Sequence, residues 1–225
     1  FLLTLIEALL HTNAVLYILD PKNSDLADLG TVMPNVYHTK EEMIDCVNAF
    51  YEGMVQRSKE MKRHPNYKTG ENYAYLGLPP CFLIFDEYVA FFEMLGTKES
   101  VGLLSQLKKI VMLGRQAGYF LIVACQRPDA KYFSDGIRDN FNFRVGLGRI
   151  SELGYGMLFG SDVKKQFFQK RIKGRGYCDV GTSVISEFYT PLVPKGHDFL
   201  QTIGFLAQAR QDGTATCEAK GDGTD

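Results

Sequence analysis

A short apolar run that ends in two adjacent acids constrains this chain more than any other feature. Residues 81–85 read Cys-Phe-Leu-Ile-Phe, and Asp86 and Glu87 follow directly. A run this short and this apolar predicts a strand buried on both faces, as in a parallel sheet. Open α/β sheets bind ligands at the carboxyl ends of their strands, where adjacent acids suit nucleotide hydrolysis. The alternative is a buried strand that merely ends in two solvated acids.

Two other apolar runs end in polar groups in the same way. Residues 14–19 run into Asp20, and residues 120–125 run into Gln126 and Arg127. Stretches with helical periodicity separate the three runs and cover residues 1–12, 40–62 and 100–113. This alternation predicts an α/β fold with parallel strands joined by right-handed crossovers. The three strand ends should then line one crevice.

The remaining elements are predicted to be short. Thr39 and Glu42 form a capping-box pattern before the helix at 40–62. Later stretches predict further helices at 134–139, 151–159, 162–169 and 197–209, a strand at 143–147, and a hairpin of 177–180 with 184–189. Gly114 and Gly118 mark the end of the helix at 100–113. We expect residues 1–194 to form one domain, and residues 195–225 to form a C-terminal helix with a flexible tail.

Composition excludes several classes of protein. The formal net charge is −1, so a polyanionic partner would have to bind a local patch. No apolar stretch approaches the roughly 18 residues that a membrane span needs. The five cysteines are scattered without a CxxC pair, which favours reduced thiols over disulfides or a zinc site. The chain begins inside an uncapped helical pattern without Met, so we expect a piece of a longer protein.

One local basic patch exists between residues 162 and 175, where six cations and one acid give a net charge of +5. Phe167 and Phe168 interleave with these cations. Such a patch suits a nucleic-acid backbone without sequence preference. A solvated face over a buried aromatic pair is the alternative. The cations are Lys164, Lys165, Lys170, Arg171, Lys173 and Arg175.

Taken together, these motifs resemble the FtsK/SpoIIIE family of DNA-pumping ATPases. The resemblance rests on Asp20-Pro21-Lys22 after the first run, on Asp86-Glu87 after the second, and on Gln126-Arg127-Pro128 after the third. The order and spacing of these motifs match those of the family over residues 1–190. The resemblance implies a RecA-like three-layer fold with a mainly parallel central sheet flanked by helices. It also implies ATP and Mg²⁺ as cofactors, and a hexameric ring that moves DNA through its channel.

The resemblance assigns roles to individual residues. Asp86 would support Mg²⁺ and Glu87 would activate water, while Gln126 would sense the γ-phosphate. Asp20, Lys22 and Gln126 would contact the nucleotide. An arginine from a neighbouring subunit should complete the site. Arg144 is the first candidate, followed by Arg149 and Arg115, because Gly156 stands where the family often has an arginine.

The chain departs from the family in one respect, because no phosphate loop of the form G-x-x-x-x-G-K-[ST] occurs in it. In the family this loop lies immediately before the first helix. Without its backbone N–H groups and lysine, nothing cradles the triphosphate. We therefore expect the 225-residue chain alone to bind ATP poorly and to be inactive, and the intact protein to be an ATPase.

The leading interpretation is an ATP-dependent DNA translocase that acts in conjugative transfer or chromosome segregation. Details of the sequence favour a relative from a conjugative or integrative mobile element, with conjugation or relaxosome proteins as partners. We expect a cytoplasmic domain of a protein that is anchored in the membrane through other segments. Two alternatives remain open: a protein-export ATPase of the same fold, as in type VII secretion, and a non-hydrolysing docking module.

Overall fold

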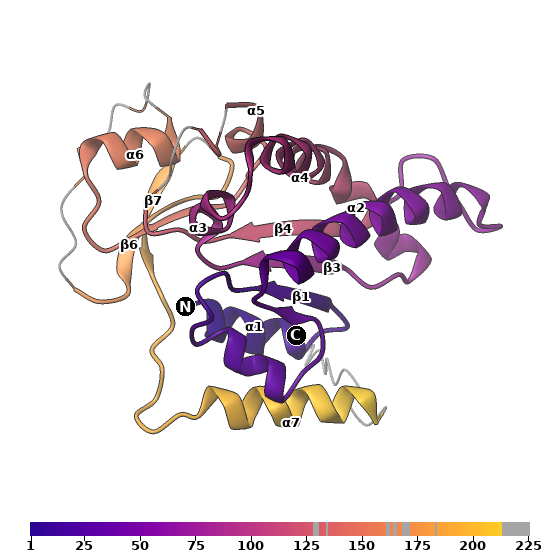
Figure 1. Ribbon diagram of the computed structural model, residues 1–225, viewed down its shortest axis with the longest axis horizontal. Helices are drawn as coiled ribbons and strands as arrows, with labels where there is room; N and C mark the ends of the chain where they lie inside the picture. The colour runs from indigo at the N-terminus through magenta and orange to yellow at the C-terminus, as the bar shows by residue number, and fades with distance from the viewer. Residues whose placement is uncertain are drawn as a thin grey trace, which may run out of the picture.

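A four-stranded parallel sheet forms the centre of the molecule (Figure 1). The computed structural model describes residues 1–127, 131–133, 135–160, 163, 166–167, 172–182 and 184–212. The strands lie in the order β2-β1-β3-β4. They are β1 (Val15–Leu19), β2 (Val36–Tyr37), β3 (Cys81–Phe85) and β4 (Tyr119–Val123). The predicted parallel arrangement is confirmed.

Helices cover both faces of this sheet. On one face α1 (Leu2–Leu10) and α7 (Phe199–Gln211) pack together, and η1 (Ala27–Thr31) joins them. On the other lie α2 (Lys40–Arg63), α3 (Tyr88–Glu93) and α4 (Thr97–Ala117) (Figure 1). Alternate residues of β3 feed the two cores: Leu83 and Phe85 face α2 and α4, and Ile84 faces α1. The RecA-like three-layer prediction is confirmed.

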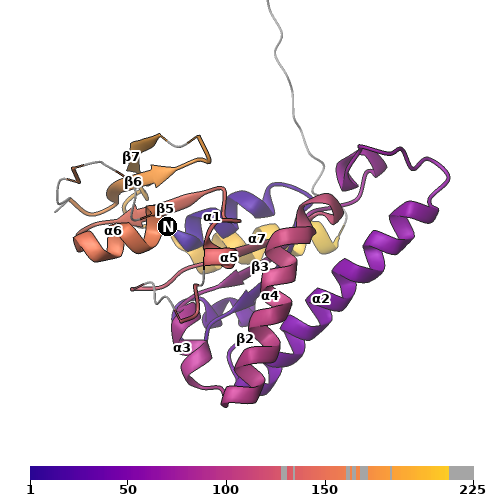
Figure 2. The same ribbon diagram turned by 90° about the horizontal axis from the view of Figure 1, so that it is seen from above.

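The last three strands form a separate antiparallel sheet at one end of the molecule, opposite the end to which α2 extends (Figure 2). They are β5 (Arg144–Leu147), β6 (Arg175–Asp179) and β7 (Ile185–Tyr189), with α5 (Asp135–Arg138) before them and α6 (Glu152–Phe159) packed on β5. The predicted hairpin is confirmed as β6 and β7. The expected strand at 143–147 pairs with β6 instead of joining the parallel sheet. Glycine makes this close pairing possible, because a Cβ on Gly176 would overlap the Gly146 carbonyl.

Helix boundaries follow local signals except where packing overrides them. Thr39 caps α2 in a complete capping box with Glu42, as predicted. The helix predicted over 100–113 extends from Thr97 to Ala117 as α4. Gly114 does not end it. This glycine is buried against the start of β4, where a Cβ would overlap the Tyr119 carbonyl. The helix ends instead at Gly118, whose φ of +77° is left-handed.

Two further expectations concern the end of the chain. Most of the predicted helix at 162–169 lies outside the described residues, and its described members are not helical. The helix predicted at 197–209 is α7, whose Ile203 and Ala207 share one core with Ile6 and Leu10 of α1. It therefore packs as part of the main fold, and residues 213–225 lie outside the described part. η2 (Tyr73–Leu76) interrupts the loop before β3.

Among the described residues, no helix combines the length and apolar character that crossing a membrane requires.

Candidate active site

The carboxyl ends of β1, β3 and β4 meet at one edge of the sheet. Leu19 pairs with Phe85, and Phe85 pairs with Val123, so the strands end level with one another. The ladder continues one residue further, since the Asp86 N–H donates to the Leu19 carbonyl (2.9 Å) and the Ala124 N–H donates to the Phe85 carbonyl (2.8 Å). Asp86 and Glu87 are thus fixed at the centre of this edge, where the sequence placed them.

Asp86 has the electrostatic setting of a cation ligand. Burial raises the pKa of its carboxyl group, and the negative charges of Asp20 and Glu87 raise it further against the opposing effects of the Glu87 N–H and Lys22. One carboxylate oxygen accepts the Glu87 N–H (3.0 Å), and the group keeps further acceptor capacity. A divalent cation would relieve this crowding of negative charge. No group of three or more metal-binding side chains gathers among the residues described, but Mg²⁺ usually needs only one or two carboxylates beside phosphates and water.

Glu87 stands at a sharp turn between β3 and α3. Its φ of 46° and ψ of 48° place a non-glycine residue in the left-handed region, which L-residues seldom occupy outside constrained sites. The Tyr88 N–H donates to the Ala124 carbonyl (2.9 Å), so the backbone is fixed on the far side of the turn. The Glu87 carboxylate lies beside Lys22, with 3.2 Å between Nζ and Oε1.

Cys125 follows β4 close to Glu87. Burial, helped by the charge of Glu87, raises the pKa of its thiol to about 11. The thiol therefore stays protonated near neutral pH, which removes it as a nucleophile.

Asp20, for which the resemblance implied a nucleotide contact, is engaged with its own loop. Its side chain is completely buried. The carboxylate accepts the N–H groups of Lys22 (3.1 Å), Ser24 (2.8 Å) and Ala27 (3.1 Å), and the Ser24 hydroxyl (2.9 Å). Both oxygens are thus engaged with the loop that follows β1. Asp20 thus shapes this loop, and its expected nucleotide contact stays a prediction.

Gln126 and Arg127 follow β4 at the same edge and are exposed. Because β4 neighbours β3, both residues follow the strand end next to that of the acid pair. This placement suits the sensor role that was predicted for Gln126, which stays a prediction.

The three candidate arginines have different surroundings. Arg144 is held inside its own chain, where it contacts Asp179 at 3.0 Å and donates to the Leu158 carbonyl at 3.2 Å. These contacts hold the guanidinium within its own chain, and the role predicted for Arg144 at a neighbouring subunit stays a prediction. Arg149 is exposed in the turn between β5 and α6. Arg115 is exposed in the last turn of α4, which leads into the opposite end of β4.

Only part of the predicted DNA-binding patch can be placed. Lys164, Lys165, Lys170 and Arg171 lie outside the described residues. Lys173 is exposed, and Arg175 lies over the ring of Tyr189 at 4.9 Å. Phe167 stacks on Tyr155 with ring centroids 4.1 Å apart. Phe167 therefore packs against the small core under α6. Phe168 lies outside the described residues.

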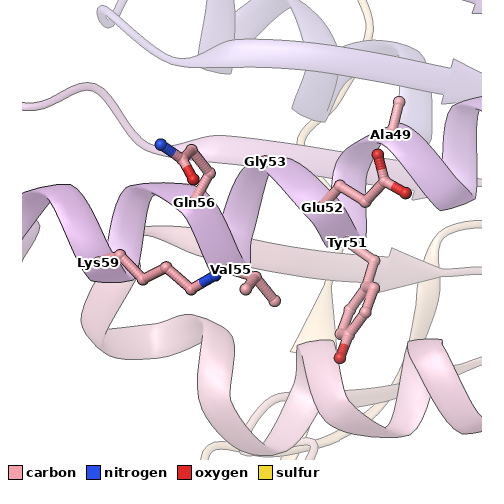
Figure 3. Close-up of a pocket in the computed structure, with 7 residues that line it drawn as sticks. All are labelled: Ala49, Tyr51, Glu52, Gly53, Val55, Gln56 and Lys59. Carbon is pink, nitrogen blue, oxygen red and sulfur yellow. The ribbon is translucent and has the colours of Figure 1, made fainter.

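One shallow pocket is formed along α2 (Figure 3). Its lining residues, which all come from α2, include Tyr51, Gly53, Gln56 and Lys59. No residue of the strand-end site contributes to this pocket, and we assign it no function.

Sequence reasoning missed two partners of the site. Ser24 donates hydrogen bonds to the Asp20 carboxylate. A serine four residues after an aspartate in a polar loop is a local signal from which this contact could have been predicted. Asp179 pairs with Arg144 from 35 residues away, and no sequence signal indicated that contact.

Comparison with known proteins decides the family. The FtsK domain-containing protein YdcQ of Bacillus subtilis (strain 168) is 53% identical over 226 residues. The chain belongs to the FtsK-domain family. This alignment covers all of the chain and 47% of YdcQ, so the chain spans about half the length of this curated relative. No protein-family model matches it.

Solved structures agree on the fold of this FtsK-domain chain. The pCW3 conjugation coupling protein TcpA, in its monomer form with ATPγS, superposes with a TM-score of 0.67 at 19% identity. That comparison covers 82% of this chain and 54% of TcpA. The cytoplasmic domain of the type VII secretion ATPase EccC of Thermomonospora curvata has a TM-score of 0.63 at 20% identity, covering 92% of this chain and 26% of EccC.

Proposed function

We propose that this chain is the part of an ATP-driven FtsK-type motor that supplies its metal ligand and its general base, and that the intact protein translocates DNA. The observation that carries the proposal is the acid pair Asp86-Glu87, fixed at the carboxyl edge of a parallel sheet in a member of the FtsK-domain family. The ATPγS-bound structure with the same fold supports ATP as the nucleotide.

In this proposal each residue at the strand ends has one task. Asp86 holds Mg²⁺, directly or through water, and Mg²⁺ neutralises charge on the transferring phosphoryl group when ATP is bound. Glu87 accepts the proton of the attacking water. Gln126 contacts the γ-phosphate from β4. The start of α1 lies at the same end of the sheet, because α1 returns directly into β1. The positive end of the helix dipole favours an anion there.

The first prediction tests the general base in the full-length protein. Glu87→Gln should lower kcat on the order of 10²–10⁴-fold, because the amide cannot accept the proton of the attacking water. ATP affinity should change little, because Asp86 is intact. Steady-state ATPase assays and titration with a fluorescent ATP analogue measure the two effects.

Glu93→Gln is the matched control, because Glu93 is an exposed carboxylate at the end of the adjacent helix α3. It should leave turnover unchanged. Near-normal hydrolysis by Glu87→Gln would exclude the assigned role of Glu87.

DNA is the proposed cargo, and protein export is the second candidate because the type VII secretion ATPase EccC shares the fold. Stimulation of hydrolysis by DNA separates the two. We further propose a ring of identical subunits, with hexamer as the expected form, a membrane anchor in other segments, and conjugation or relaxosome proteins as partners. The 53% identity to an FtsK domain-containing protein supports the motor class. The cargo and the partners are to be identified by experiment.

The second prediction concerns the basic patch in the full-length protein. Replacing Lys164, Lys165, Lys170 and Arg171 with glutamine should weaken DNA binding similarly for all sequences. Each lost phosphate contact should reduce the salt slope on duplex DNA by about 0.9. Binding isotherms on two unrelated duplexes at several salt concentrations measure this slope. An unchanged slope would mean that the patch is a solvated surface.

A further inference from the structure

A lysine from the loop after β1 contacts the proposed general base. Lys22 Nζ lies 3.2 Å from Glu87 Oε1, with 44% and 17% of the two side chains exposed. The lysine follows β1 and the glutamate follows β3, and these strands are neighbours in the sheet. The ion pair therefore bridges two adjacent strand ends at the candidate site.

The loop that carries Lys22 has a fixed shape. The buried Asp20 carboxylate accepts backbone N–H groups from Lys22, Ser24 and Ala27, all within 3.1 Å. Asn23 adopts a positive φ of 50° between them. The Asp20 N–H donates to the Tyr37 carbonyl of β2 (3.0 Å), which ties the loop to the sheet. The backbone of Lys22 is thus held in place, and only its side chain retains freedom.

The backbone of Glu87 is equally constrained. Its left-handed φ of 46° is maintained by the N–H contact to Asp86 (3.0 Å) and by the bond from Tyr88 to Ala124 (2.9 Å). The direction of the glutamate side chain is therefore set by its own rotamer and by Lys22. Lys22 is also the cation that offsets the negative charge that Asp20 and Glu87 place around Asp86.

We propose that Lys22 is a positioning residue that holds the Glu87 carboxylate in one orientation for accepting the proton of the attacking water. The inference rests on the proposed ATPase function and adds a residue to that site. It differs from direct nucleotide binding, which the sequence suggested for Lys22. A lysine that binds phosphate contributes to nucleotide affinity, whereas a lysine that orients the base contributes to kcat.

The test uses the full-length protein with Lys22→Met, which keeps most of the aliphatic stem and removes the charge. We expect kcat to fall about 10–100-fold, as for a misplaced catalytic group, while the affinity for a fluorescent ATP analogue stays within about twofold. Lys22→Arg should restore most of kcat, because it returns a cation to the same place. Lys40→Met is the matched control, since Lys40 also pairs with a glutamate, Glu99, at 2.9 Å. Its kcat should match wild type.

A double-mutant cycle separates the two roles of Lys22. In the Glu87→Gln background, Lys22→Met should change residual turnover, followed with γ-labelled ATP, by less than about twofold, because its target is already gone. A loss of ATP affinity as large as the loss of kcat, in both backgrounds, would instead make Lys22 a nucleotide ligand and overturn the inference. Unchanged or increased kcat in Lys22→Met would also overturn it. A wild-type protein that does not hydrolyse ATP, with or without DNA, would overturn the proposed function itself.

Discussion

Single side chains in this protein often hold neighbouring segments in place where a sequence motif would suggest a ligand contact. Asp20 belongs to a family motif, yet it is fully buried and engaged with its own loop. Arg144 matches a family position, yet it pairs with Asp179, which is 5% exposed. A buried charge requires partners within the fold. Asp20 therefore holds the loop after β1, and Arg144 holds Asp179.

The third prediction follows from the Arg144–Asp179 pair. Arg144→Met should lower the free energy of unfolding by about 2–4 kcal/mol, because it leaves the buried Asp179 carboxylate without its charged partner. The double variant Arg144→Met/Asp179→Asn should lose less than the sum of the single variants. Urea unfolding of the chain measures this coupling. Arg149→Met, at an exposed position, serves as the control and should stay within about 0.5 kcal/mol. Additive losses in the double variant would contradict the pairing.

At the scale of elements, a local capping signal sets where α2 begins. The Glu42 N–H donates to the Thr39 hydroxyl, and the Glu42 carboxylate accepts that hydroxyl at 2.6 Å. This hydrogen bond is the main cause that lowers the pKa of Glu42. An acid whose pKa is lower in the folded state stabilises the fold above its unfolded pKa, and that stability is lost as the pH falls through the folded pKa.

The fourth prediction applies this pH dependence of stability to the capping box of α2. Thr39→Ala should lower the free energy of unfolding by about 1 kcal/mol at neutral pH. The difference in unfolding free energy between Thr39→Ala and wild type should become smaller as the pH falls below 4.5, the ordinary pKa of Glu42. In the variant, the Glu42 pKa should rise toward that value in an NMR titration. Thr69→Ala, in the exposed loop before β3, is the control. An unchanged Glu42 pKa in Thr39→Ala would contradict the capping box as its cause.

At the scale of the whole molecule, the strand-end site offers acids and an amide from this chain, and phosphoryl transfer benefits from an added arginine. An arginine donated by a neighbouring subunit can contribute on the order of 10³–10⁵ in rate. For the proposed ATPase, Arg149 is the leading candidate, because it is exposed in the turn between β5 and α6 while Arg144 is paired within its own chain.

The fifth prediction tests this arrangement by mixing subunits of the full-length protein. Subunits with Arg149→Ala and subunits with Glu87→Gln should each be inactive alone. In the proposed ring, mixed assemblies contain interfaces with both wild-type groups and should regain part of the ATPase activity. Activity is measured against the mixing ratio, and ring formation is checked by mass. If mixed rings form without any recovery, Arg149 acts within its own subunit or is structural, and Arg115 becomes the next candidate.

The sequence by itself determined the parallel sheet, its flanking helices and the acid pair, because apolar runs and helical periodicity are local and repeat over many residues. Only the tertiary structure decided that 143–147 joins an antiparallel sheet, that Gly114 lies inside α4, and that Lys22 contacts Glu87. These features depend on contacts between segments distant in sequence, where close backbone approach and charge burial outweigh local preference. The contacts of single polar residues at the site therefore depend on how the strands are arranged in the tertiary structure, and the sequence alone does not predict them.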